Sequence, residues 1–338
     1  MKKSQKENTK FASFLYSDRF GVKRCAKKKV CRNSILEYHG LSNLKEKLEI
    51  ENKKISNTKN GTSTNCCIEK YADLLNSLNY SLSIPPRVSS TTIEKEEYGV
   101  VEMAAFNFWK YLNKDRVFER NIEIWRQFWL VCEKSDTICQ IVDSRRIKYY
   151  YNKDIHILYP NKKHVLFVNK CDLSSIKADN PANILSYYYS TKEGEFDFTL
   201  KGKIGFVGYP NVGKSSTINL IMKSKKVKVS NTPGKTKYLQ TIKGPDFEIY
   251  DCPGLVFPKH EKVDLILMGV INVDHCVDLG KYTEQILDFI GIENIRKYYN
   301  INEMYNQNTV LEYLSRIYKI NHTKCIQKIV KDFFSNKF

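Results

Sequence analysis

A run of eight residues beginning at Gly208 has the composition and spacing of a phosphate-binding loop. It reads GYPNVGKS, fits the pattern G-x-x-x-x-G-K-S/T, and follows the apolar run 203–207. Its glycines let backbone N–H groups converge on phosphate oxygens where a helix begins, and the helix dipole favours anions there. Lys214 is expected to reach the β- and γ-phosphates, and the Ser215 hydroxyl to bind Mg²⁺. The loop residues expected to contact the nucleotide are Gly208, Pro210, Asn211, Val212, Gly213, Lys214, Ser215 and Ser216.

A second motif, N-K-C-D from Asn169 to Asp172, follows the apolar run 164–168. Such a string arises readily by chance in a chain rich in Asn and Lys, so its position after a strand gives it weight. The Asp172 carboxylate can accept hydrogen bonds from N1 and N2 of guanine. Adenine has no such donors and would leave the carboxylate unpaired, at a cost of about 1–3 kcal/mol. Asn169, Lys170 and Asp172 therefore predict GTP and GDP, and not ATP, as ligands.

A third motif, D-C-P-G from Asp251 to Gly254, ends the apolar run 247–250. Asp251 is expected to hold a water of the Mg²⁺ ion, and the Gly254 N–H to sense the γ-phosphate. Upstream of it, Thr236 in the string TPGKT is the expected switch threonine for Mg²⁺ and the γ-phosphate. The residues assigned to catalysis are Lys214, Thr236, Asp251 and Gly254, and those assigned to Mg²⁺ are Ser215, Thr236 and Asp251.

Short apolar runs alternate with helical segments through the middle of the chain. Helical segments separate several of the runs, which predicts an α/β fold with a doubly wound, mostly parallel sheet. The runs of strand length are 137–142, 164–168, 187–189, 203–207, 238–242 and 247–250. One helical face, predicted to cover the sheet, is formed by Phe118, Ile122, Trp125, Trp129 and Cys132. Further helices are predicted at 281–298, 309–319 and 324–335.

The order of the three motifs differs from that of an ordinary GTPase. There the phosphate-binding loop comes first and N-K-x-D late, whereas here Asn169 precedes Gly208, and Asp251 comes last. A doubly wound sheet tolerates such a circular permutation because its termini can lie close together. The chain leaves the nucleotide-binding domain directly after the D-x-x-G motif, which predicts that the nucleotide state acts on the C-terminal helices.

Positive charge is concentrated at the beginning of the chain. The net charge is +18, and residues 1–60 hold sixteen Lys and Arg against six Asp and Glu. This stretch is expected to neutralise RNA phosphates; the alternative is a solvated tail that only keeps the chain in solution. Neither a membrane span nor a secretory signal is expected, so we predict a soluble intracellular protein. The ten cysteines lack zinc-finger spacing and are expected to be reduced thiols.

The predicted organisation has three parts. Residues 1–95 form a basic, partly disordered extension, with a polar and turn-rich linker at 56–92. Residues 96–258 form the permuted GTPase domain, and 259–338 form a helical domain.

With these motifs in this order, the chain resembles the circularly permuted YlqF-type GTPases, which act in ribosome assembly. The strings that carry the resemblance are FERNIEIWRQFW (118–129), QIVDSRR (140–146), VNKCD (168–172), VGYPNVGKSSTIN (207–219), VSNTPGKTKYLQT (229–241) and DCPGLVFP (251–258). By this resemblance, Ser190 and Thr191 look like the fifth guanine motif, which is usually Ser-Ala. Asp143-Ser144-Arg145 is similar to the family's Asp-Ala-Arg signature. Asn211 is similar to the asparagine that lets related GTPases use K⁺.

The likeness is strongest to the eukaryotic cytoplasmic GTPases of large-subunit maturation, and it implies a function. The implied factor binds GTP and Mg²⁺ on a late large-subunit precursor, and hydrolysis releases it together with a nuclear export adaptor. Its implied partners are rRNA and ribosomal proteins, and it is expected to be monomeric. Leu255 stands where signalling GTPases carry the glutamine that orients water, so slow intrinsic hydrolysis is expected, stimulated by K⁺ or the ribosome.

Other functions stay open at this point. One alternative is a family member that acts in the nucleolus or the mitochondrion. Another is an RNA-binding scaffold that keeps GTP without hydrolysing it, although Lys214, Thr236 and Asp251 argue against that. A P-loop kinase is disfavoured by Asn169 and Asp172.

Overall fold

The computed structural model describes residues 67–173, 184–193, 201–223, 239–302, 307–335 and 337. The basic stretch 1–60 and Thr236 lie outside the described residues, so the predictions made for them stay predictions. The chain divides into two compact units. The first comprises 1–130, 154–158 and 257–259, and the second 131–153, 159–256 and 260–338. Their boundaries differ from the three predicted domains, and that division also stays a prediction.

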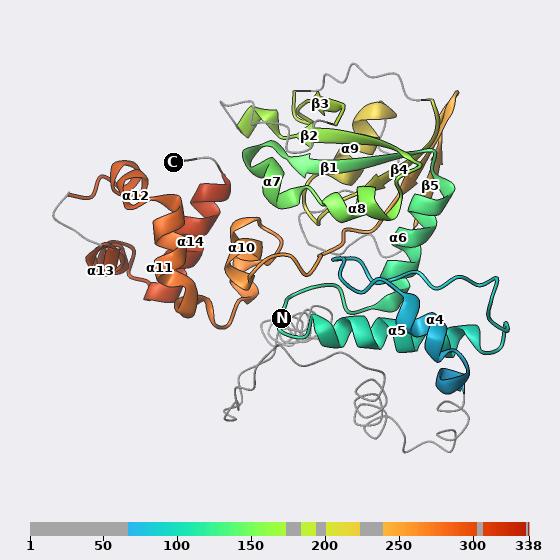
Figure 1. Ribbon diagram of the computed structural model, residues 1–338. Helices are drawn as coiled ribbons and strands as arrows, with labels where there is room; N and C mark the ends of the chain where they lie inside the picture. The colour runs from blue at the N-terminus through green and yellow to red at the C-terminus, as the bar shows by residue number, and fades with distance from the viewer. Residues whose placement is uncertain are drawn as a thin grey trace, which may run out of the picture. The chain divides into compact units, whose positions relative to one another are not determined.

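A six-stranded sheet forms the centre of the second unit, in the order β3-β2-β1-β4-β6-β5 (Figure 1). Its strands are β1 (Thr137–Asp143), β2 (Lys163–Asn169), β3 (Ser186–Tyr188), β4 (Gly202–Val207), β5 (Gln240–Lys243) and β6 (Phe247–Asp251). The neighbours pair in parallel except β5 and β6, which are antiparallel. The predicted α/β fold with a mostly parallel sheet is confirmed.

The parallel strands bring the nucleotide motifs to one edge of the sheet. Asp143 at the end of β1 is the register partner of Asn169 at the end of β2. In the same way, Phe206 near the end of β4 is the partner of Asp251 at the end of β6. Parallel strands carry their carboxyl ends at the same edge, where α/β proteins bind their ligands. The permuted order along the chain therefore still collects the motifs in one place.

Helices α7 (Ile147–Tyr150) and α9 (Lys214–Ile221) of the second unit border this edge. The C-terminal end of a third helix, α6 (Ile122–Lys134), approaches the sheet. A Cβ built on Gly205 of β4 would lie 2.5 Å from the Ser135 hydroxyl, directly after α6, so only glycine permits this approach. The predicted helix was expected to include Phe118, which is wrong. Phe118 precedes α6 and packs edge-on against Trp109 with 5.0 Å between ring centroids.

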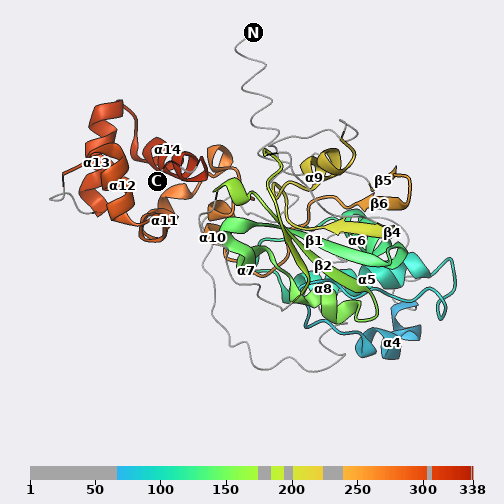
Figure 2. The same cartoon turned by 90° about the horizontal axis from the view of Figure 1, so that it is seen from above.

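The C-terminal region is helical, as predicted. It contains α10 (Lys262–Leu267), α11 (Thr283–Ile290), α12 (Ile292–Tyr299), α13 (Gln307–Tyr318) and α14 (His322–Phe334). Helix α14 contacts α11 and α13, and the two views show α11 to α14 grouped together (Figures 1 and 2). The single helix predicted at 281–298 is wrong, because Gly291 adopts φ 86° and separates α11 from α12. Short 3-10 turns are η1 (Ser144–Arg146), η2 (Cys171–Leu173), η3 (Val273–His275) and η4 (Leu279–Tyr282).

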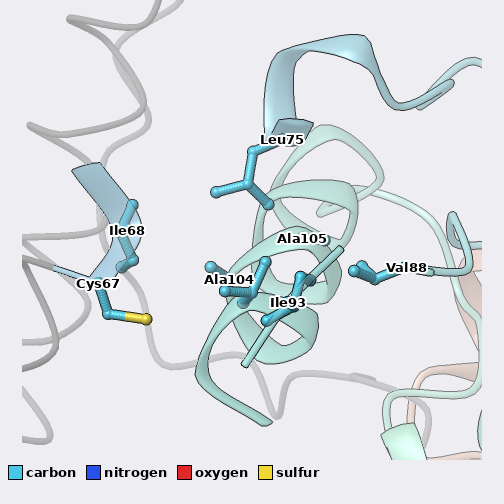
Figure 3. Packing of buried hydrophobic residues seen from close by; sticks show 8 residues of the cluster. Cys67, Ile68, Leu75, Val88, Ile93, Ala104 and Ala105 are labelled. Carbon is cyan, nitrogen blue, oxygen red and sulfur yellow. The ribbon is translucent and has the colours of Figure 1, made fainter. Parts of the chain in front are cut away.

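The described part of the predicted linker 56–92 is packed into the first unit, which corrects that prediction. This unit contains α4 (Ala72–Ser77), α5 (Tyr98–Leu112) and α8 (Lys153–Leu158). Leu75 of α4 and Val88 pack against Ala104 and Ala105 of α5 (Figure 3). The carboxylate of Asp154 accepts hydrogen bonds from the backbone N and the hydroxyl of Ser83 at 2.8 and 2.5 Å. These buried contacts were not predicted, because the residues that make them are widely spaced in a turn-rich stretch of sequence.

None of the helices in the described ranges has the length and apolar character that crossing a membrane requires.

Candidate functional site

The phosphate-binding loop runs from the end of β4 to the beginning of α9. Gly208 has φ 149° and Gly213 φ 100°, backbone conformations that side-chain-bearing residues rarely adopt. A Cβ on Gly213 would lie 2.1 Å from the Asn169 side-chain nitrogen, and one on Gly208 would lie 2.6 Å from the Ile141 carbonyl oxygen. Ser215 and Ser216 lie in the first turn of α9, half-buried. The loop therefore has the backbone shape that its motif predicts.

Lys214 and Asp251 form a buried pair of charges beside this loop. Lys214 is 8% exposed, and its Nζ donates to the carbonyl oxygens of Gly208 and Tyr209 at 2.9 and 2.7 Å. Asp251 is 1% exposed, and neither of its carboxylate oxygens accepts a hydrogen bond. Burial raises the pKa of Asp251 to about 7 and lowers the pKa of Lys214 to about 8, and each charge partly offsets the shift of the other.

These two residues fit a nucleotide with a divalent cation. A buried carboxylate without donors costs free energy that a cation removes, and a buried ammonium bonded only to carbonyls is ready for phosphate oxygens. Within the described ranges, no cluster of three or more His, Cys, Asp or Glu is arranged to hold a metal. Mg²⁺ at nucleotide sites keeps waters and phosphates among its ligands, so Ser215 and Asp251 would suffice as its protein contacts here.

Asn169 joins the three segments expected to bind the nucleotide. It is fully buried, and its Nδ2 donates to the Val212 carbonyl of the phosphate-binding loop at 2.9 Å. Its Oδ1 accepts from the backbone N of Lys170 at 2.7 Å and of Thr191 at 3.2 Å. The loops after β2, β3 and β4 are thereby fixed to one another through a single amide.

Asp172 is prepared to accept hydrogen bonds from a ligand. The Ser190 hydroxyl donates to its Oδ1 at 2.7 Å, and the exposed Lys192 lies 3.2 Å from its Oδ2. Partial burial raises the pKa of Asp172, but the hydrogen bonds from Ser190 and Lys192 outweigh burial, and the net pKa is lowered. The carboxylate stays charged at neutral pH, which is the form that guanine N1 and N2 require.

The D-C-P-G segment packs directly on the phosphate-binding loop. A Cβ on Gly254 would lie 2.9 Å from the Cα of Pro210, so the two backbones touch at a residue without a side chain. The backbone N of Leu255 donates to the Gly208 carbonyl at 3.2 Å, and its side chain is fully buried. Asn211, at φ 65°, donates from Nδ2 to the Gly269 carbonyl at 2.9 Å. A movement of the D-C-P-G segment is therefore expected to displace the phosphate-binding loop.

The structure thus brings together the predicted residues of all three motifs. Thr236, the predicted switch threonine, lies outside the described residues. The site assignments themselves stay predictions. Asp143, Ser144 and Arg145 match a family signature, but no role in the site was predicted for them. Asp143 ends β1 and pairs with Lys170, Ser144 donates to the Lys170 carbonyl, and Arg145 pairs with Asp143. Their signal was available, because β1 was predicted and its end had to meet the end of β2. The predicted sheet tyrosine Tyr189 also hydrogen-bonds Thr217 of α9, with 2.6 Å between the two oxygens.

A mostly parallel sheet with a phosphate-binding loop, an N-K-x-D loop and a D-x-x-G loop at one edge defines a P-loop GTPase fold, and its motif order is circularly permuted. A family model described as "50S ribosome-binding GTPase" matches residues 203–316.

Known proteins are similar to parts of the chain. It is similar to Large subunit GTPase 1 of Schizosaccharomyces pombe, with 36% identity over 236 residues, 49% of this chain and 37% of that protein. It is also similar to Nuclear/nucleolar GTPase 2 of Oryza sativa subsp. indica, with 28% identity over 222 residues, 57% of this chain and 42% of that protein. The chain spans less than half the length of these two relatives. A solved structure, "Crystal structure of GNP-bound YlqF from T. maritima", aligns with a TM-score of 0.40 and 17% identity, covering 63% of this chain and 93% of that chain.

In motif order and in sequence, the chain resembles circularly permuted GTPases and is similar to the eukaryotic large subunit GTPases.

Proposed function

We propose that the protein binds and hydrolyses GTP as an assembly factor of the large ribosomal subunit. The observation that carries the proposal is the buried pair of Lys214 and Asp251 beside a phosphate-binding loop that Asn169 ties to the guanine-type motif. The names of the relatives, Large subunit GTPase 1 and Nuclear/nucleolar GTPase 2, support the ribosomal assignment.

Different residues of the site would bind the guanine base and the phosphates. Asp172 would accept hydrogen bonds from guanine, and the backbone N–H groups of the loop at Gly213 and Lys214 would meet the phosphates. The Lys214 ammonium would exchange its two carbonyl partners for phosphate oxygens and stabilise the charge that develops on them. Ser215, Asp251 and, by the sequence prediction, Thr236 would hold Mg²⁺, which neutralises phosphate charge when bound.

Slow intrinsic hydrolysis is part of the proposal. Leu255 has a buried, apolar side chain that offers no group to orient an attacking water. K⁺ beside Asn211, or the ribosomal particle itself, is the proposed source of stimulation. Single-turnover hydrolysis measured in potassium and in sodium buffers, with and without large-subunit precursors, tests this point. Fast turnover without either would contradict it.

The proposed step is late maturation in the cytoplasm, where hydrolysis would release the factor and a nuclear export adaptor. The proposed partners are rRNA and ribosomal proteins, with the chain acting as a monomer. Gradient sedimentation of cytosolic extract tests the proposal, with the protein loaded with GDP or a non-hydrolysable GTP analogue. Migration with the large subunit only in the GTP-like state is expected. Migration with it in neither state would contradict the cytoplasmic assignment.

A nucleolar step is the second candidate, because one relative carries the name Nuclear/nucleolar GTPase 2. The location of the tagged full-length protein separates the two. Accumulation in the nucleolus at steady state, with sedimentation on nuclear precursors, would favour the nucleolar step. A Lys214→Ala variant that accumulates on cytoplasmic particles would favour the late step.

A further inference from the structure

The segment Asp143–Ser144–Arg145 lies beside the guanine-type loop without belonging to any of the three nucleotide motifs. Asp143 and Ser144 are 0% and 4% exposed, so both are part of the interior. The parallel pairing of β1 and β2 sets Asp143 opposite Asn169. The next residue of the neighbouring strand's loop, Lys170, is therefore within reach of both side chains.

Lys170 has an unusual backbone conformation that needs support. Its φ is 65°, in the left-handed region that residues other than glycine adopt infrequently. Its carbonyl oxygen accepts from the backbone N of Leu173 at 2.9 Å, which closes the turn that carries Asp172. The same oxygen accepts from the Ser144 hydroxyl at 2.8 Å. Ser144 thus fixes the Lys170 peptide group, and the orientation of that group sets the direction in which the Asp172 side chain points.

The side chain of Lys170 is held by the same segment. Its Nζ lies 2.9 Å from Oδ2 of Asp143, and Arg145 donates to both carboxylate oxygens at 2.9 and 2.7 Å. Burial raises the pKa of Asp143, but the hydrogen bond from Arg145 and the charges of Lys170 and Arg145 lower it to about 2. The carboxylate is charged at neutral pH and fixes the side chain of Lys170, while the Ser144 hydroxyl holds its backbone carbonyl.

We propose that Asp143 and Ser144 are positioning residues of the guanine site, which hold Lys170 in its left-handed conformation so that Asp172 is aimed at the base. The inference rests on the proposed binding of guanine nucleotides. Ser144 makes its contact through the side-chain hydroxyl, which alanine lacks. Without these contacts the turn relaxes, and the bound form loses the order that Asp172 needs.

The test compares Ser144→Ala and Asp143→Asn with wild type in the full chain, using GDP that carries a fluorescent methylanthraniloyl group on its ribose. Loss of one neutral hydrogen bond is expected to weaken binding about threefold to tenfold in Ser144→Ala, and loss of the carboxylate charge tenfold or more in Asp143→Asn. The loss is expected in the KM for GTP and not in kcat, because the phosphate contacts are unchanged.

Two matched controls separate positioning from general destabilisation. Ser135→Ala also removes a fully buried hydroxyl that donates to a backbone carbonyl, that of Val131 at 2.6 Å. Asp332→Asn removes a carboxylate that is 5% exposed and paired with Lys328 at 3.0 Å. Both controls are expected to bind the GDP probe as wild type does.

The outcomes are distinct for the two proposals. If wild type binds the probe and Ser144→Ala binds it as tightly, the positioning role is wrong while the proposed function stands. Equal weakening in Asp143→Asn and Asp332→Asn, or a loss confined to kcat, would also overturn the positioning role. If wild type does not bind the probe at all, the proposed function itself fails.

Discussion

The two sides of the proposed nucleotide site differ in how completely their polar groups are hydrogen-bonded. On the base side, Asn169, Asp172 and Asp143 all have hydrogen-bond partners within the protein. On the phosphate side, Asp251 is buried with no hydrogen bond to either oxygen, and Lys214 is bonded only to backbone carbonyls. A buried charged group without hydrogen bonds is costly. The base side is therefore built in advance, and the phosphate side stores a free-energy cost that a bound ligand would remove.

This difference suggests how binding and switching are separated. A preorganised base side gives affinity and selectivity with little rearrangement. The phosphate side, where the Asp251 carboxylate has no hydrogen bond, is expected to respond most strongly to the bound nucleotide and cation. Gly254 and Leu255 connect this side to the start of the C-terminal region. The nucleotide state is therefore expected to act on the D-C-P-G segment more than on the N-K-C-D loop.

Replacing the phosphate-side lysine should have the largest effect. Lys214→Ala removes the ammonium that is expected to contact the phosphates, so GTP hydrolysis should fall by about 10²–10³-fold. Single-turnover assays measure this loss. Lys148→Ala, which removes an exposed lysine of α7, serves as the control and should be silent. If Lys214→Ala kept the wild-type rate of hydrolysis, the proposed difference between the base side and the phosphate side would be wrong.

Asp251→Asn should uncouple stability from activity. The pKa of Asp251 in the folded apo protein is about 7, above its value of 3.8 in the unfolded chain. The folded state binds the proton more tightly, so stability present at about pH 4 is lost as the pH rises to about 7, by about 3–4 kcal/mol. Asp251→Asn should abolish this decline and stabilise the apo protein at pH 7.5, while it eliminates Mg²⁺-dependent hydrolysis.

Urea unfolding without nucleotide between pH 5 and pH 7.5 measures this decline. Higher pH is avoided because the pKa of Lys214, lowered to about 8, adds a trend of opposite sign there. A pH dependence that persists unchanged in Asp251→Asn would show that the phosphate side does not store this free energy.

On the base side, Asp172→Asn should weaken GDP binding about tenfold to a hundredfold and leave the apo stability nearly unchanged. The carboxylate loses the charge that accepts from guanine N1 and N2, while Ser190 can still donate to the amide oxygen. Titration with a fluorescent GDP gives the affinity, and urea unfolding the stability. Strong destabilisation of the apo protein would show that the base side is not built in advance.

The smallest effect on hydrolysis is expected for Leu255→Gln. The side chain at this position is fully buried, so a glutamine there should not raise the hydrolysis rate. Burial of its amide should instead destabilise the fold by about 1–3 kcal/mol. A clear gain in single-turnover rate would show that the buried position of Leu255 changes when GTP binds.

Some features of the fold could be read from the sequence because they are local. The strands around 137–142 and 164–168 and the loop from Gly208 carry their own patterns of apolar residues and glycines. Packing across long distances in the chain was less accessible. Leu75 and Val88 are buried against α5, yet they are single apolar residues within polar, turn-rich stretches. Gly291 broke a predicted helix because a glycine within a helical pattern is ambiguous until its neighbours are placed.

The sequence by itself determined the permuted order of the motifs and predicted the class of ligand, because the loop from Gly208 and the N-K-C-D string are each recognisable within a few residues. Only the tertiary structure decided which groups support them. The contacts of Asp143 and Ser144 with Lys170, and the unmet charge of Asp251 beside Lys214, depend on strands far apart in the chain ending at one edge. Hydrogen bonding and burial are properties of that assembled edge, and no single segment of the sequence carries them.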